Sequence, residues 1–168
     1  IGAVLLAHRL REVRVLHGFR RYDYDSDLVD VNLGPRGRER WLPAVESFGE
    51  GVLVTLDERS VAEWEVDPRV VERVSLMERR RQASTIGSRL GEVSPRLVLL
   101  HTLSHLLIRE LAYSCGYSAA SLRERIYSSG VDSPRAGILI YTAAGDAEGT
   151  LGGLVRQGEA PRLVASVM

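Results

Sequence analysis

Two histidines, His101 and His105, have a type and spacing that suit metal chemistry. Residues four apart share one face of a helix, so both imidazoles would project from the same side. Zinc would need a third protein ligand from elsewhere in the chain, because two imidazoles leave the ion undercoordinated. The pair lacks the glutamate of the HExxH motif, so its spacing alone is a weak metal signal. We therefore predict structural histidines, packed and hydrogen-bonded to backbone or carboxylate groups, and keep the metal site as the alternative.

An acidic, glycine-rich segment is the second candidate site. The apolar run AGILIYT, residues 136–142, is typical of a strand covered on both faces, and AAGDAEGTLGG follows it. Open α/β sheets usually place ligands at such strand ends. The glycine spacing matches neither the dinucleotide fingerprint nor the P-loop, and carboxylates in the loop would repel phosphate. The candidate functional residues of this loop are Asp146, Glu148, Gly149, Gly152 and Gly153.

Two interpretations of this acidic pair remain open. In the first, Asp146 and Glu148 join His101 or His105 in metal-dependent or acid–base hydrolysis, since carboxylates and imidazoles are common in such sites. In the second, the carboxylates cap a helix that begins near Thr150 and pair with Arg123 or Arg125. We favour the second interpretation, because it needs no ligand.

All 22 basic residues are arginines, and the formal net charge is zero. The overall charge therefore predicts neither nucleic-acid nor membrane binding. Arginine recognises phosphate well, although GC-rich codon usage explains the same composition without a ligand. The densest basic cluster, Arg79 to Arg81, is a candidate phosphate contact; pairing with Glu72 and Glu78 along a solvated helix face is the simpler explanation. Aspartates over residues 23–30 predict a solvated loop, because they lack the glycine and closing glutamate of a calcium loop.

A long helix over about 94–115 is expected to organise the chain. Ser94 and Pro95 suit its start, and Gly116 suits its end. Apolar residues lie on nearly all sides of it, so we predict that little of this helix faces water. It has no apolar run long enough for a membrane span.

The remaining elements predict an α+β fold with a mixed or partly parallel sheet. Residues 3–16 read as a helix followed by a strand, and SAASLRERIY, residues 118–127, as a helix paired with the central one. We expect a β-hairpin over 41–56 that turns at Gly49 to Gly51, and helices over 57–64 and from Pro68 onwards. We place an N-terminal lobe at 1–66 and a helical and α/β core at 67–168.

Several of these segments together resemble a known family. HTLSHLLIRELAYSCGYSAASLRERIY and AGILIYTAAGDAEGTLGGLVRQG are similar to the signature of the DrmB family of DISARM antiphage defence systems, and to the C-terminal region of MrfA-type helicases. LREVRVLHGFRR and WLPAVESFGEGVLVTLDERSVAEWE resemble the segments that precede this signature. The positions that match the motif are His101, His105, Glu124, Arg125, Tyr141, Asp146, Glu148, Gly149, Gly152 and Gly153.

The resemblance implies a non-catalytic, helicase-associated subunit in a prokaryotic defence complex. Such a subunit would assemble with a DrmA-type helicase and help it bind and recognise foreign DNA. The family assigns no agreed chemistry to the matching positions. A metal-dependent hydrolase acting on nucleic-acid phosphodiesters is the alternative suggested by the histidines and carboxylates above.

The cysteine content differs from the family pattern. Family members usually carry a cysteine cluster, thought to bind zinc, downstream of the segment that corresponds to 163–168, whereas Cys115 is the sole cysteine here. We therefore expect no metal ligand in these residues and place zinc in a C-terminal continuation. The apolar end of the chain agrees with a longer protein. One cysteine excludes an internal disulfide, which suits a reducing, cytoplasmic compartment.

Overall fold

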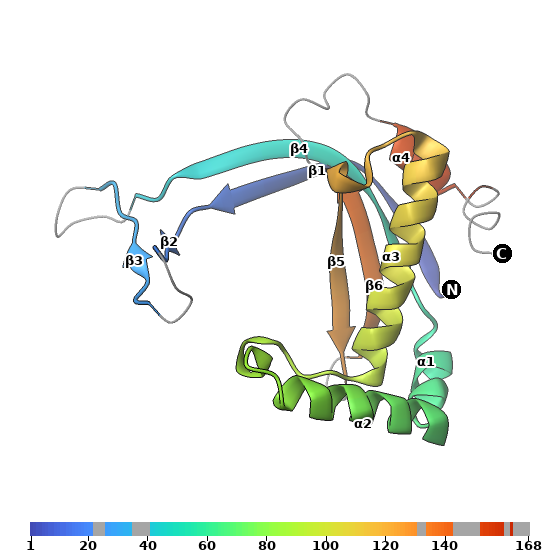
Figure 1. Ribbon diagram of the computed structural model, residues 1–168. Helices are drawn as coiled ribbons and strands as arrows, with labels where there is room; N and C mark the ends of the chain where they lie inside the picture. Colours follow the sequence, from blue (N-terminus) through green and yellow to red (C-terminus); the bar gives the residue numbers. More distant parts are fainter. Residues whose placement is uncertain (22–25, 35–40, 131–133, 143–151, 160–161, 163–168) are drawn as a thin grey trace.

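A computed structural model of the chain describes residues 1–21, 26–34, 41–130, 134–142, 152–159 and 162 (Figure 1). Its centre is a four-stranded sheet with the order β1-β4-β6-β5. The strands are β1 (Ala3–Val15), β4 (Ala44–Thr55), β5 (Leu122–Ser129) and β6 (Arg135–Thr142). The strands from the first third of the chain thus share one sheet with those from its last third. The domain boundary placed at residue 66 stays a prediction.

All neighbouring strands of this sheet are antiparallel, so the α+β class is confirmed but the mixed or partly parallel sheet is wrong. A parallel pair needs a long crossover connection, usually a helix. The segment between β5 and β6 is too short for one, and these two strands pair directly with each other. The long connection from β4 to β5 instead carries helices α1 (Glu58–Glu65), α2 (Pro68–Gln82) and α3 (Pro95–Cys115).

The predicted hairpin over 41–56 is also wrong, because β4 is one continuous strand through both glycines. Gly51 lies opposite Ala7 of β1 and Tyr141 of β6, so it has a neighbouring strand on each side. A Cβ atom at Gly51 would lie 3.1 Å from both Leu139 Cδ1 and Tyr141 Cβ. The glycine therefore permits close approach of strands rather than a turn.

Two predicted helices are strands in the structure. Residues 3–16 form β1 almost throughout, so only the strand half of that prediction is confirmed. Ser118 caps a short 3-10 turn, η2 (Ala119–Ser121), and not a helix; β5 follows it. Leu122 and Ile126 are four apart, which places them on one side of a helix but equally on one face of a strand. Pairing with β6 decides in favour of the strand.

The other helices follow their sequence signals. They are α1 (Glu58–Glu65), α2 (Pro68–Gln82), α3 (Pro95–Cys115) and α4 (Gly153–Gln157), with a 3-10 turn, η1 (Gly87–Arg89). Ser94 caps α3 by accepting from the Leu97 amide at 3.2 Å, and Gly116 ends it with φ 71°. None of the helices in the described part of the chain is long and apolar enough to cross a bilayer.

Helix α3 lies across one face of the sheet, and α2 runs across the N-terminal end of α3 (Figure 1). The core contains Leu100, Leu107 and Leu111 of α3 together with Ile138 and Ile140 of β6. The prediction that α3 is buried nearly all round is wrong, because the sheet covers only one of its sides. On the outer side Leu106 is 54% exposed and Tyr113 is 89% exposed.

Strands β1 and β4 continue beyond the core as a two-stranded arm (Figure 1). At its end, β2 (Gly18–Phe19) pairs with β3 (Val29–Asp30) in a small antiparallel sheet. Most side chains described in this region are exposed, as expected for the segment after Phe19. Asp23 and Asp25 of the predicted acidic loop lie outside the described residues.

Candidate metal centre

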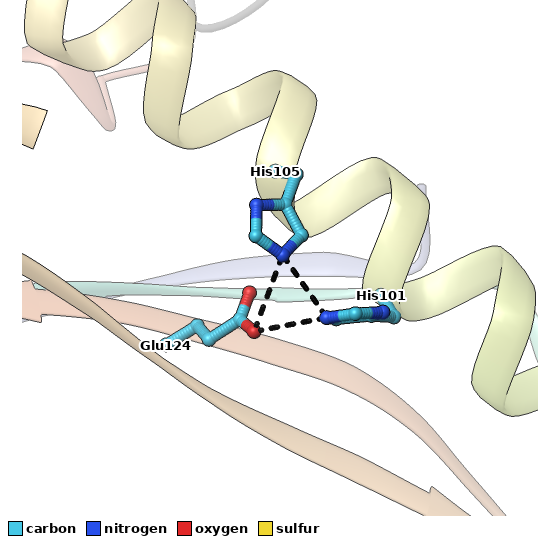
Figure 2. A group of neighbouring side chains, drawn as sticks. All are labelled: His101, His105 and Glu124. Carbon is cyan, nitrogen blue, oxygen red and sulfur yellow. Dashed lines mark hydrogen bonds and ion pairs between the residues drawn. The ribbon is translucent and has the colours of Figure 1, made fainter.

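His101 and His105 lie one turn apart on α3, on the flank of the helix that faces β5 (Figure 2). Their Nε2 atoms are 3.0 Å apart. The ring planes are inclined at 74°, and the ring centroids are 4.6 Å apart. The two imidazoles therefore turn the same nitrogen toward one point instead of stacking.

Glu124 of β5 supplies the third group of this cluster (Figure 2). Its Oε1 lies 3.5 Å from His101 Nε2 and 3.8 Å from His105 Nε2. Alternation along β5 places Glu124 on the same face as Leu122 and Ile126, which pack toward α3. The sheet thus directs the carboxylate at the flank of α3 that carries the two histidines.

The three atoms fit one metal ion. The shortest distance at which one ion can lie equally far from all three atoms is about 2.0 Å, so an ion slightly out of their plane has zinc bond lengths of about 2.0 to 2.2 Å to nitrogen and oxygen. Glu124 Oε2 is buried and has no hydrogen-bond partner among the described groups. A buried carboxylate oxygen without a partner is costly, and a neighbouring cation would compensate for it.

The prediction of packed structural histidines is therefore only partly right. Both rings have polar neighbours, but their side chains are 56% and 61% exposed, so neither is a core residue. The sequence argument did require a third ligand from elsewhere in the chain. Glu124 was noted only as a motif position, and the signal that identifies it is the alternation Leu122-x-Glu124-x-Ile126 on a strand.

The structure describes the acidic loop only from Gly152 onwards. Asp146, Glu148 and Gly149 lie outside the described residues, so their predicted roles stay predictions. Gly152 and Gly153 lie at the start of α4, and Gly152 has the left-handed φ of 113°.

Glu50 of β4 was missed as a functional anchor, because the sequence argument placed it in a hairpin turn. Its side chain is 1% exposed. Its carboxylate accepts from the amides of Gly152 at 2.7 Å and Leu154 at 2.8 Å, and from the Tyr117 hydroxyl at 3.1 Å. Glu50 therefore joins the start of α4 and the segment after α3 to the sheet.

Tyr141 and Arg123 belong to a separate polar group centred on Glu12 of β1. The Tyr141 hydroxyl donates to Glu12 Oε1 at 3.0 Å, and Arg123 donates to Glu12 Oε2 at 2.9 Å. Desolvation, supported by the Glu12 carboxylate, raises the pKa of Tyr141. Arg125, two residues along β5, is exposed.

Of the three arginines proposed as a phosphate contact, Arg81 has a structural role. It forms a bidentate pair with Glu78 at 2.6 and 2.8 Å and donates to the carbonyls of Gly87 and, at 3.0 Å, Leu90. This hydrogen bonding lowers the pKa of Glu78 to about 2. The predicted Glu78–arginine pairing is confirmed, and Arg79 and Arg80 are the exposed members of the cluster.

Comparison with known proteins gives two matches. Residues 103–164 match the family model of the MrfA Zn-binding domain. In an alignment 171 positions long, the chain is 38% identical to the DISARM protein DrmB of Bacillus paralicheniformis. That alignment covers 95% of this chain but 30% of the relative, so the chain spans less than a third of the length of the curated relative that it matches.

The zinc-domain match bears on the metal centre. It includes His105 and Glu124 and begins two residues after His101. The expectation that the zinc-binding region lies wholly outside these residues is therefore not supported. With a single cysteine in the chain, a cysteine-rich zinc site is excluded within these 168 residues, whereas the His101, His105 and Glu124 group fits a metal ion.

Proposed function

The chain is a homologue of the DISARM protein DrmB, and from this we propose that it acts as a non-catalytic, helicase-associated part of an antiphage defence complex. It would help a DrmA-type helicase bind and recognise foreign DNA. The observation that carries the proposal is the 38% identity over 95% of the chain, which includes both the arm and the sheet–helix core.

The exposed arginines of α2 are the DNA contact that we propose for this part of the protein. Arg79 and Arg80 lie exposed in the last turn of α2, whereas Arg81 beside them donates to the carbonyl of Gly87 in the following turn. Arginine binds phosphate through its planar fork of donors. Each phosphate contact with duplex DNA contributes about 0.9 to the slope of log affinity against log salt.

The test of this function uses the complete protein and a DrmA-type helicase. We expect the two to co-purify at moderate salt, and the complex to bind DNA more tightly than the helicase alone. The double variant Arg79→Gln/Arg80→Gln should reduce the salt slope by about 1 to 2, while Arg59→Gln, an exposed arginine of α1, should leave it unchanged. Absence of co-purification together with unchanged DNA affinity would reject the proposal.

A metal-dependent phosphodiester hydrolase is the second candidate, favoured by one observation. The histidine side chains are more than half exposed, so a metal held by three protein ligands would keep a position open to water, as catalytic zinc sites do. A bound zinc ion would supply Lewis acidity and an activated water. DNA cleavage by the complete protein that is lost in Glu124→Gln and retained in Glu46→Gln would establish this activity; no cleavage with added zinc or manganese would dismiss it.

A further inference from the structure

We propose that His101, His105 and Glu124 bind one Zn²⁺ ion that fastens α3 to the edge strand β5. This site does not depend on the helicase-associated function proposed above, and the second candidate function would use the same three ligands. It is also distinct from a cysteine-ligated zinc, because all three ligands are imidazole or carboxylate groups.

The orientation of the ligand atoms is the first argument. The two Nε2 atoms face each other at 3.0 Å, yet neutral imidazole carries a hydrogen on only one of its nitrogens. A direct contact satisfies at most one donor and one acceptor, whereas a metal ion uses the lone pairs of both rings. The tautomers required are those with Nδ1–H, which leave each Nε2 free to bind the ion.

The surroundings of Glu124 are the second argument. Its side chain is 26% exposed, and its Oε2 atom is buried with no hydrogen-bond partner in the described structure. The other oxygen, Oε1, lies 3.5 and 3.8 Å from the two histidine Nε2 atoms, which is too far for strong hydrogen bonds. Bound zinc would place a double positive charge beside this carboxylate and remove the cost of its desolvation.

The identity of the ligands selects the metal. Calcium and magnesium prefer oxygen ligands, and copper(II) and nickel(II) prefer tetragonal geometry. Two imidazoles and one carboxylate suit tetrahedral zinc with three protein ligands. The fourth position faces solvent, because both histidine side chains are more than half exposed. We assign a water molecule to that position.

The position of the site predicts what the ion does. Among the strands that the structure describes, β5 lies at one edge of the sheet and pairs with β6 alone. Edge strands and helix surfaces open locally more easily than central strands. The ion would join the middle of α3 to this strand, which are otherwise linked by the packing of residues such as Leu107 and Leu122. Zinc should therefore slow the opening of β5 more than that of β1 at the opposite edge.

The test measures zinc in the complete protein, so any additional metal site is present equally in wild type and variants. We expect His101→Gln/His105→Gln and Glu124→Gln to contain one equivalent of zinc less than wild type. His8→Gln replaces an exposed histidine on β1, at the other edge of the sheet, and should lose none. The exposed rings can be replaced without opening the core, so the histidine double variant remains folded.

A second readout follows β5 itself. After chelation and zinc readdition, hydrogen exchange over 122–129 should slow in wild type and in His8→Gln, and remain unchanged in the site variants. At a hundred-fold excess of zinc over its dissociation constant, the melting midpoint of wild type should rise by roughly 5 to 10 °C. Cobalt substitution should give the absorption spectrum of a tetrahedral site in wild type only. Equal zinc content in wild type and the histidine double variant, or zinc-independent exchange of β5, would overturn the proposal.

Discussion

Replacing Glu50 by glutamine tests whether one buried carboxylate holds the C-terminal part of the fold. Glutamine keeps the shape of the side chain but exchanges one acceptor oxygen for an NH₂ donor. The two carboxylate oxygens now accept from Gly152, Leu154 and Tyr117, and the side chain is 1% exposed. The variant therefore leaves at least one buried amide facing a donor.

The expected loss follows from these contacts. Hydrogen bonds to charged groups are worth about 1.5 to 3 kcal/mol, and a buried donor left without a partner costs about 1 to 3 kcal/mol. We expect Glu50→Gln to lower the free energy of unfolding by about 2 to 4 kcal/mol. This corresponds to a decrease of roughly 4 to 16 °C in the melting midpoint of a domain of this size.

Thermal and urea unfolding of the variant would measure this loss. Glu46→Gln is a matched control, because it makes the same chemical change on the same strand at a side chain that is 43% exposed and paired with Arg11 at the surface. Exposed ion pairs contribute about 0 to 1 kcal/mol, so the control should change little. If Glu50→Gln is no more destabilising than Glu46→Gln, the anchoring role of Glu50 is wrong.

Three further perturbations have expected outcomes. Arg96 is buried, pairs with Glu65 at 2.8 Å and donates to the Ser129 carbonyl at 2.7 Å. Arg96→Met should therefore lower the free energy of unfolding, measured in urea, by about 3 to 5 kcal/mol, and a decrease below about 1 kcal/mol would contradict this. Arg81 lowers the pKa of Glu78 from its usual value of 4.5 to about 2, so the ionised carboxylate stabilises the folded state fully above pH 4.5 and loses this effect as the pH falls toward 2. The free energy of unfolding should therefore depend less on pH between 5 and 2 in Glu78→Gln than in wild type. Gly116 has φ 71°, so Gly116→Ala should lower stability by about 1 kcal/mol, and an unchanged melting midpoint would refute the left-handed cap.

Local chemistry along the chain was sufficient to predict the helices that begin with a cap. Ser94, Asp57 and Asp67 each accept from an amide two or three residues away, and Gly116 ends α3 through its own backbone conformation. These interactions need no distant partner, which is why their signals are readable in the sequence. The buried strand over 135–142 was likewise predictable from its continuous apolar residues.

Residue spacing alone predicted the wrong element where the helix and strand periodicities place the same residues on one side. Leu122 and Ile126 lie on one side of either a helix or a strand, and Leu6 and Leu10 are equally ambiguous. Gly49 and Gly51 suggested a turn, although in the fold they lie in a strand that has neighbours on both sides. In each case the pairing partner is more than ten residues away, so no local pattern contains the answer.

The sequence predicted one part of the candidate metal centre, and the tertiary structure supplied the other. The sequence alone placed His101 and His105 on one helical face, because helix geometry relates residues four apart. Only the tertiary structure added Glu124, since the antiparallel register of β5 with β6 determines which of its side chains face α3. The same long-range packing left one side of α3 in solvent, and that exposure makes two histidines of an apolar helix accessible to a metal ion.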